Sequence, residues 1–365
     1  MKRNKTKLLY LFRNSIKNDL SKAKNGQIPK DYFYFYHEFK KKFNLDFATV
    51  ASDNFFVKLF HLVIDHTLNL IIGINFPLIT ILPLLKRINR SQFVFATTPK
   101  TGLSLGLLKK LRLINKPRIV MNICGLYDQF INKQNSFNKR VLKSWLLEVD
   151  LFISGSSWHE CELLASNFNL DITLFRFAPY SGIDIDFFKP AITSADKYIL
   201  GIGIDPARDW KLYRQVALSF PNEKFLFATQ PALVKLTMPK NVRLQYFENA
   251  NLVEKIRNSK IVLILNNQNQ HFSGQASAMR CMSCSKAVIL TKTPGVEEFR
   301  FKHLINCILV DPGNLKQIVS HINALNQQDD LKEHIGKNAS TLIRTFYNYK
   351  IIANQYISIF QQLVH

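Results

Sequence analysis

Residues 260 to 291, KIVLILNNQNQHFSGQASAMRCMSCSKAVILT, decide the fold class. An apolar run up to Leu265 leads into a polar loop, Gly274 follows, and helical spacing begins near Ala276. A second apolar run occupies residues 287–290. A short strand, a helix and another short strand in this order indicate a βαβ unit with two parallel strands.

The same alternation extends over most of the chain. In the second half, strands are expected at 197–204, 224–229, 241–247, 260–266, 286–291 and 306–314, and helices at 210–220, 250–259, from about Ala276 and from about Leu315. In the first half, strands are expected at 92–98, 118–125, 150–156 and 172–179, and helices at 102–113, 138–149 and 157–168. Such alternation predicts two doubly wound α/β domains with a cleft between them, and residues 179–197 form the best candidate linker.

The composition and charge restrict the partners. The chain has 365 residues, of which 47% are hydrophobic and 21% are charged, as in a globular protein. Its formal net charge of +23 implies an anionic partner, either nucleic acid, a phospholipid surface or a phosphorylated substrate. Residues 1–43 hold twelve Lys or Arg and three acids, and residues 86–118 hold nine Lys or Arg and no acid. This local excess favours an anionic surface beside the first domain over a solvated basic face.

The segment at residues 68–85 is so apolar that it must be considered as a possible membrane span. A span needs roughly 20 apolar residues, and Asn75 and Pro77 interrupt this run. A pair of buried helices, a hairpin that contacts a membrane, and a transmembrane helix all remain open. The first twenty residues lack the apolar core of a signal peptide, and five cysteines suggest reduced thiols, so a cytoplasmic location is expected.

Residues 201–211, GIGIDPARDWK, form the first candidate site. A strand closes near Gly203, and Arg208 and Lys211 lie at the start of the next helix. Two cations beside exposed backbone N–H groups suit a diphosphate. The alternative is a helix start with ordinary surface cations. A dinucleotide fingerprint is not present, because the third glycine is missing.

The loop and helix of the opening stretch form the second candidate site. Ser273 and Gly274 precede the helix that begins near Ala276. Gly274 lets the backbone approach a ligand, and the first N–H groups of the helix lack internal partners. A phosphate or a sugar hydroxyl suits this site. Glu297 and Glu298, in the next turn, could receive ligand hydroxyls or could be a solvated pair.

The Cys281-x-x-Cys284 pair is interpreted as structural. Zinc needs four ligands, and no second pair of ligating residues lies nearby. A redox pair normally stands at the start of a helix, whereas these cysteines lie inside or at the end of one. No metal site and no nucleophile are therefore predicted from the residues.

Four motifs resemble group 1 glycosyltransferases, a family with the GT-B fold. The linker SGIDIDFFKP (181–190) resembles the family's NGxDxxFFxP, and RCMSCSKAVILT (280–291) resembles EAMACGKPVIAT. PGVEEFRFKHLINCILVDPGN (294–314) and GIGIDPARDWKLY (201–213) are similar to two further family segments. The resemblance is closest over 181–314 and extends over 93–180.

The resemblance implies a GT-B architecture of two Rossmann-like domains that face a central cleft. Residues 1–180 would bind the acceptor, residues 181–345 would bind a nucleotide-sugar, and residues 346–365 would cross back as a helix. It further implies a hexosyltransferase-type enzyme that retains anomeric configuration and needs no metal or other cofactor. We expect the acceptor to be a lipid-linked or envelope glycan, with the protein peripheral on the inner face of the cell membrane and no nucleic-acid partner.

The resemblance also assigns roles to residues. Arg208 takes the place of the cation that neutralises the donor diphosphate, with Lys211 as a helper. Gly274 and Gln275 fall in the glycine loop beside the phosphate and the donor sugar. Arg280 stands at the donor where the family has a glutamate. This departure supports an alternative, a catalytically inactive GT-B scaffold that binds a nucleotide or an anionic polymer.

Overall fold

The computed structural model describes residues 5–50, 67, 72–74, 76–131, 134–180, 182–191 and 197–364. The chain forms two compact units. The first unit contains Met1–Ser21, Tyr32–Tyr180 and Ala353–His365, and the second contains Lys22–Asp31 and Ser181–Ile352. Both units are therefore assembled from segments that are not contiguous in the sequence.

The first unit is built on a parallel six-stranded sheet with the order β2-β1-β3-β4-β5-β6. Its strands are β1 (Lys7–Phe12), β2 (Asn44–Thr49), β3 (Phe93–Ala96), β4 (Arg118–Asn122), β5 (Leu151–Ser154) and β6 (Phe175–Phe177). The sequence pattern predicts no strand before residue 92, so it misses β1 and β2. All residues of β1 after Lys7 are buried, as expected for a strand that is covered on both faces.

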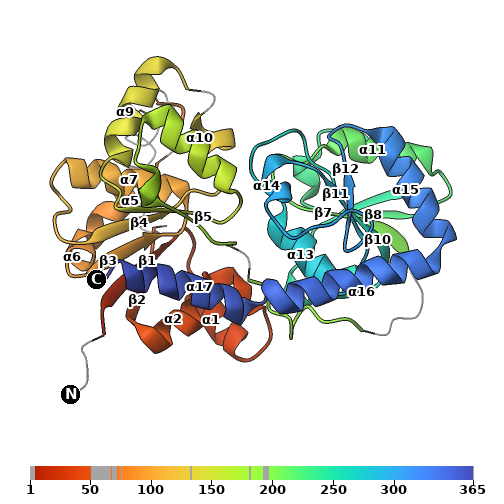
Figure 1. Cartoon of the computed structure of the whole chain (residues 1–365), viewed down its shortest axis with the longest axis horizontal. Helices are drawn as coiled ribbons and strands as arrows, with labels where there is room; N and C mark the ends of the chain where they lie inside the picture. The colour runs from red at the N-terminus through yellow and green to blue at the C-terminus, as the bar shows by residue number, and fades with distance from the viewer. Residues whose placement is uncertain are drawn as a thin grey trace. The chain divides into compact units, whose positions relative to one another are not determined.

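Helices cover this sheet (Figure 1). They are α1 (Lys17–Lys24), α2 (Tyr36–Lys42), α5 (Leu78–Ile81), α6 (Leu85–Ile88), α7 (Pro99–Lys110), α8 (Leu126–Gln129), α9 (Ser136–Leu146), α10 (Trp158–Phe168) and α17 (Tyr349–Gln362). Short 3₁₀ turns lie at Lys30–Phe33, Leu82–Leu84 and Ile172–Leu174. The order α1, Lys30–Phe33 and α2 connects the first two strands.

The apolar segment at 68–85 is described only in part. Residues 68–71 and 75 lie outside the described residues, as do residues 51–66 before them. Of the described residues, Ile74, Phe76 and Ile81 are buried in the core of the first unit. These three side chains are therefore core, whereas Leu82 in the same segment is 37% exposed. In the described part of the chain, no helix combines the length and the apolarity needed to cross a membrane.

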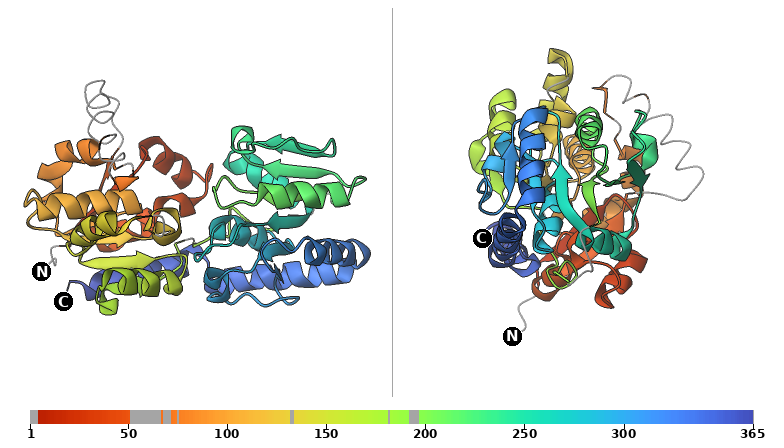
Figure 2. Two further views of the ribbon diagram at one scale, coloured as in Figure 1. Left: turned by 90° about the horizontal axis from the view of Figure 1, so that it is seen from above. Right: turned by 90° about the vertical axis from the view of Figure 1, so that its right-hand side faces the viewer.

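The second unit contains another parallel six-stranded sheet, with the order β12-β11-β10-β7-β8-β9. Its strands are β7 (Tyr198–Ile202), β8 (Phe225–Ala228), β9 (Val242–Gln245), β10 (Ser259–Ile264), β11 (Val288–Thr291) and β12 (Ile308–Val310). The helices are α11 (Trp210–Ser219), α12 (Asn249–Arg257), α13 (Gln275–Ser283), α14 (Pro294–Glu297), α15 (Leu315–Gln327) and α16 (Asp329–Phe346), with a 3₁₀ turn at Pro231–Leu233. Figure 2 shows the strands of each sheet between layers of helices.

The predicted elements of this unit are present, and local side chains explain several helix starts. The Asp209 side chain accepts a hydrogen bond from the Leu212 N–H and caps α11. The Asn314 side chain caps α15 in the same way. These caps satisfy N–H groups that have no partner within the helix.

The strand order defines where a ligand site is expected. In the second sheet the chain starts in the middle with β7 and then places β8 on one side and β10 on the other. Open α/β sheets bind ligands outside the carboxyl ends of the strands where the order reverses. The carboxyl ends of β7 and β10 are therefore the place to search.

Candidate active site

Arg208 lies at this point of the second sheet. It follows β7 by a short loop, and its side chain turns back toward the end of that strand. Nε donates to the Ile202 carbonyl oxygen at 3.0 Å, and Nη1 donates to Ser273 Oγ at 3.2 Å and to Asn266 Oδ1. The residue is only 3% exposed. These contacts join the ends of β7 and β10 to the loop before α13.

The recorded partners of the Arg208 guanidinium are all neutral. Among the described residues, no Asp or Glu forms an ion pair with it, and Nη2 donates no recorded hydrogen bond. A buried charge needs a partner of opposite sign to offset the cost of leaving water. This arrangement is suited to an anion that arrives with a ligand.

Two glycines make room for the guanidinium. A Cβ on Gly203 would lie 2.5 Å from Arg208 Nη2, and a Cβ on Gly274 would lie at the same 2.5 Å distance from that atom. Both glycines have a positive φ, +140° and +84°, which residues with a side chain rarely adopt. Gly203 and Gly274 therefore act together through Arg208, a relation that their separate motifs do not reveal.

Asn266 organises the site and was not predicted. It is fully buried just after β10, and its side-chain N–H donates to the Ser273 carbonyl oxygen at 2.9 Å. Its backbone N–H donates to Thr291 Oγ1, at the end of β11, at 3.0 Å. The only sequence signal was an asparagine at the end of a buried apolar strand, which is common in surface turns.

The start of α13 faces the same region. Gly274 is the N-cap, and Gln275 and Ala276 are the first helical residues. Gln275 is fully buried, whereas Gly274 and Ala276 are partly exposed. The free N–H groups of this first turn and the helix dipole favour a negative charge. The structure thus brings Gly203, Arg208, Ser273, Gly274 and the start of α13 together.

Two further buried polar atoms are available to a ligand. Thr229 follows β8 and lies beside Gly203, whose N–H donates to the Ala228 carbonyl oxygen. The Thr229 hydroxyl and the Asn269 side-chain oxygen are buried without a hydrogen-bond partner in the described part of the chain. Buried polar groups are usually hydrogen-bonded, so these two atoms suit hydroxyl groups of a ligand.

Two further predicted residues lie on α11 and at the end of α14. Lys211 is exposed on α11, and the structure records no hydrogen bond or ion pair between it and another described residue. Glu298 is half-buried at the C-cap of α14. The neighbouring Glu297 forms an ion pair with Lys292 at 3.0 Å. The roles of Lys211 and Glu298 stay predictions.

Arg280 lies toward the other end of α13 and has a partner far away in the sequence. Its Nη2 lies 3.0 Å from Asp31 Oδ2, and its guanidinium lies over the Phe188 ring at 5.2 Å. Burial raises the pKa of Asp31, while the nearby Arg280 charge opposes this shift. The ion pair attaches segment Lys22–Asp31 to the second unit.

The cysteines of this helix are buried thiols. Burial raises the pKa of Cys281 well above its ordinary value and raises that of Cys284 to about 12. A thiol that stays protonated is a poor nucleophile and a poor metal ligand. No group of three or more His, Cys, Asp or Glu side chains is placed to hold a metal ion in the described part of the chain.

The first sheet has a similar reversal of strand order between β1 and β3. Arg13 follows β1, and Lys100 is in the first turn of α7, just after β3. Burial and the charge of Arg13 lower the pKa of Lys100. Two cations thus influence each other at the carboxyl edge of the first sheet, where a second ligand would be expected.

Comparisons with known proteins identify the fold. No protein-family profile and no curated protein matches the sequence. Among solved structures, Anabaena HepE in complex with UDP and glucose is similar with a TM-score of 0.72 and 14% identity, over 98% of this chain and 100% of that chain. A Rickettsia africae glycosyltransferase has a TM-score of 0.68 and 16% identity, over 99% of both chains. Sucrose-phosphate synthase from Thermosynechococcus elongatus has a TM-score of 0.70 and 11% identity, over 98% of this chain and 99% of that chain. Together with the two parallel six-stranded sheets and their flanking helices, these matches show that the chain has the GT-B fold.

Proposed function

We propose that the chain is a glycosyltransferase that moves a sugar from a nucleotide-sugar to a glycan acceptor. The observation that carries this proposal is the buried Arg208 guanidinium, which has only neutral recorded partners and lies beside the start of α13. A cation and helix N–H groups in a site without bulk water stabilise the charge that develops on a leaving nucleoside diphosphate. HepE has been solved with UDP and with UDP-glucose, which supports a uridine nucleotide as the first donor to test.

Each residue of the site has a role in this proposal. The Arg208 side chain binds the diphosphate, and the N–H groups at Gln275 and Ala276 bind it from the helix. Ser273 and Asn266 hold the guanidinium in position. Thr229 and Asn269 are available for hydroxyl groups of the ribose or the sugar. Lys211 and Glu298 stay predicted helpers at the diphosphate and the sugar, and Arg280 stays a predicted contact on the donor side.

The finer parts of the function are also proposals. We infer a hexosyltransferase-type reaction with retention of configuration, no metal, and a lipid-linked or envelope glycan as acceptor. Arg13 and Lys100 support an anionic acceptor in the first unit. The basic stretches at residues 1–43 and 86–118 support peripheral attachment to the inner face of a cell membrane. Nucleic acid is not a proposed partner.

To test the proposal, the rate of sugar transfer and the affinity for UDP are measured for the Arg208→Ala variant. We expect about 10²–10³-fold slower transfer, because one main electrostatic partner of the leaving group is removed. Arg208→Lys keeps the charge but loses the forked contacts, so it should recover only part of the activity. Arg214→Ala, on the exposed face of the same helix, is the matched control and should retain full activity.

Two outcomes separate the candidate functions. If Arg208→Ala binds UDP with the same affinity as the original protein, the diphosphate lies elsewhere. Arg280 favours the second candidate, a scaffold that binds a nucleotide without transfer, because it occupies a position where the resembling family has an acid. Tight UDP binding without sugar transfer from UDP-glucose to any lipid-linked acceptor would support that scaffold.

A further inference from the structure

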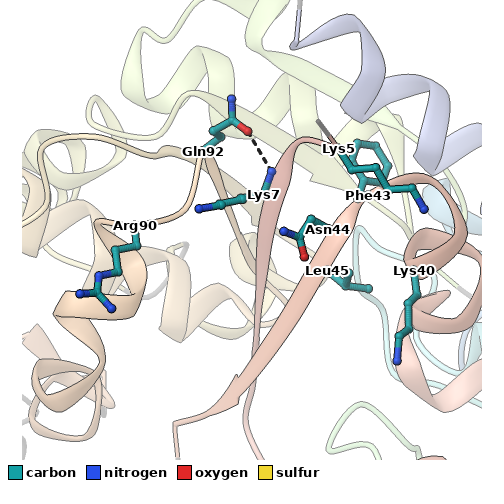
Figure 3. Close-up of a pocket in the computed structure, with 8 residues that line it drawn as sticks. All are labelled: Lys5, Lys7, Lys40, Phe43, Asn44, Leu45, Arg90 and Gln92. Carbon is teal, nitrogen blue, oxygen red and sulfur yellow. Dashed lines mark hydrogen bonds between the residues drawn. The ribbon is translucent and has the colours of Figure 1, made fainter. Parts of the chain in front are cut away.

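A basic pocket opens at the opposite edge of the first sheet. Its volume is about 920 Å³, and it lies at the amino ends of β1 and β2 and beside the start of β3 (Figure 3). The parallel register explains the position, since Lys7 is paired with Asn44 and Gln92 directly precedes β3. Ligands of open α/β sheets bind at the carboxyl edge, so this pocket is distinct from a substrate crevice.

Four cations line the pocket, and no acid does. They are Lys5, Lys7, Lys40 and Arg90. Figure 3 shows Lys7 extended toward the side of Arg90, with Lys5 and Lys40 on the side of Phe43. Gln92 Oε1 accepts a hydrogen bond from the Lys7 backbone N–H at 2.8 Å, which fixes the edge between the two groups of cations.

The four cations differ from two of their basic neighbours, which are paired with acids. Lys41 Nζ lies 2.7 Å from Glu38, and Arg87 Nη2 lies 2.7 Å from Asp46. In contrast, none of the four forms an ion pair with a described residue. Among their side chains, only Lys5 donates a hydrogen bond to a described residue, from Nζ to the Lys41 carbonyl oxygen at 3.0 Å. Glu38 and Asp46 therefore each neutralise a cation beside the pocket, and the four cations that line it have no such partner among the described residues.

The basic edge continues past this pocket. A second hollow, of about 470 Å³, shares Arg90 and Gln92 with the first and adds Lys116 and Arg118. Arg118 starts β4, the next strand of the same sheet. Cations thus follow the amino ends of four neighbouring strands. A row of this length can contact several phosphate groups at once.

Exposed aliphatic side chains accompany these cations. Leu111 and Leu113 are 57% and 44% exposed, and the Asn89 side chain donates to the Leu113 carbonyl oxygen at 2.8 Å. Val364, 44% exposed, lines the second hollow. A nucleic acid offers little to such side chains, whereas a lipid surface accepts both aliphatic groups and cations.

We propose that this edge of the first unit docks on an anionic phospholipid surface, with headgroup phosphates at Lys5, Lys7, Lys40 and Arg90. The exposed leucines enter the boundary between the headgroups and the acyl chains. This proposal rests on the membrane part of the proposed function and gives that part a location, but it does not require sugar transfer.

Sedimentation with vesicles tests the proposal on the full chain. One set of vesicles is phosphatidylcholine, and the other is an equal mixture of phosphatidylcholine and phosphatidylglycerol. We expect the protein to bind only the anionic set. A variant with Lys5→Gln, Lys7→Gln, Lys40→Gln and Arg90→Gln should bind at least about tenfold more weakly, since each well-placed cation contributes a several-fold factor.

The matched control removes four exposed cations from the second unit, by Lys197→Gln, Lys235→Gln, Lys316→Gln and Lys337→Gln. It has the same net charge as the pocket variant and should bind within about twofold of the original protein, because long-range charge is screened by salt. An equal loss in both variants would overturn the assignment to this pocket. Unchanged thermal unfolding would show that both variants are folded.

A second pair of measurements separates lipid from other polyanions. Leu111→Ser with Leu113→Ser should weaken vesicle binding severalfold and leave retention of a single-stranded oligonucleotide unchanged. If the leucine variant binds vesicles normally while the pocket variant loses the oligonucleotide, a polyanion site replaces the lipid site. UDP binding is measured in parallel, so that failure of the donor site is distinguished from failure of this surface.

Discussion

At the scale of single residues, Arg208 determines the conformation of its surroundings. Its guanidinium occupies the space where side chains at positions 203 and 274 would begin. Both positions therefore need glycine for two reasons, a positive φ and the closeness of a charged group. Polar side chains at Asn266 and Ser273 then hold the guanidinium by hydrogen bonds. The arginine is fixed before any ligand arrives, which lowers the cost of binding.

Substitution of either glycine tests this arrangement. Gly203→Ala and Gly274→Ala would each place a Cβ 2.5 Å or less from a guanidinium nitrogen, so the arginine must move. We expect UDP binding to weaken at least about tenfold and the free energy of unfolding to fall by about 1–3 kcal/mol. Isothermal titration with UDP and chemical unfolding measure the two effects.

Gly313→Ala provides the control for backbone strain. Gly313 also has a positive φ, +73°, but no atom lies within 4 Å of the added Cβ. This variant should lose stability to a similar extent and bind UDP normally. Normal UDP binding by Gly203→Ala and Gly274→Ala would instead show that Arg208 is not the nucleotide contact.

At the scale of elements, helix α13 is held at both ends by different means. Its start is part of the site around Gly274, and its later part carries Arg280, which pairs with Asp31 in the 3₁₀ turn Lys30–Phe33. The Arg280 and Asp31 side chains are 10% and 1% exposed. The Asp31 Oδ1 atom has no hydrogen-bond partner in the described residues. The carboxylate thus depends on the arginine for compensation.

Substitution of Arg280 should therefore destabilise the folded protein. We expect Arg280→Met to lower the free energy of unfolding at neutral pH by about 3–5 kcal/mol, because a buried carboxylate loses its cation. Asp31→Asn added to Arg280→Met should restore most of that loss. Arg87→Met breaks the exposed pair with Asp46 and should cost at most about 1 kcal/mol.

The pH dependence of the Arg280→Met variant has a defined sign. Burial already raises the pKa of Asp31, and loss of the guanidinium removes the main opposing influence. The folded variant then keeps a proton that the unfolded chain has lost, so its stability rises as the pH falls through the window above the ordinary aspartate pKa. When unfolding by urea is measured from neutral to acid pH, the difference in free energy of unfolding between the variant and the original protein should become smaller. A constant difference would contradict a charged, buried Asp31.

The sequence predicted the elements better than the contacts between them. Alternating apolar runs and helical spacing gave the strands from β3 to β12, because local periodicity is enough for buried parallel strands. β1 and β2 were not predicted, since KLLYLF and NLDFAT lie among basic and aromatic residues in a segment with no clear strand–helix alternation. Arg208, Ser273 and Gly274 were named from local motifs. Asn266, Thr229 and the Asp31–Arg280 pair depend on contacts between distant segments, which periodicity does not report.

At the scale of the whole molecule, each unit includes a segment that is far in the sequence from its main part. The second unit includes Lys22–Asp31, and the first includes residues from Ala353 onward. In the first unit, the Tyr356 hydroxyl of α17 donates to the Ala178 carbonyl oxygen at 3.1 Å. The Phe360 ring packs edge-on against Phe39 and Phe95, with centroids 5.3 and 5.6 Å away. The first sheet therefore completes its core only after the last helix has been made.

This organisation predicts a local effect for a substitution near the C-terminus. Phe360 is fully buried, so Phe360→Ala should destabilise the first unit by about 3–5 kcal/mol through lost burial and a cavity. Hydrogen exchange should show reduced protection in β1 and β3 and unchanged protection in β10 and β11, because units that open separately are protected by their own stability. Phe346→Ala, at an exposed ring in α16, is the control and should change protection little. An equal loss of protection in both sheets would mean that the two units unfold as one.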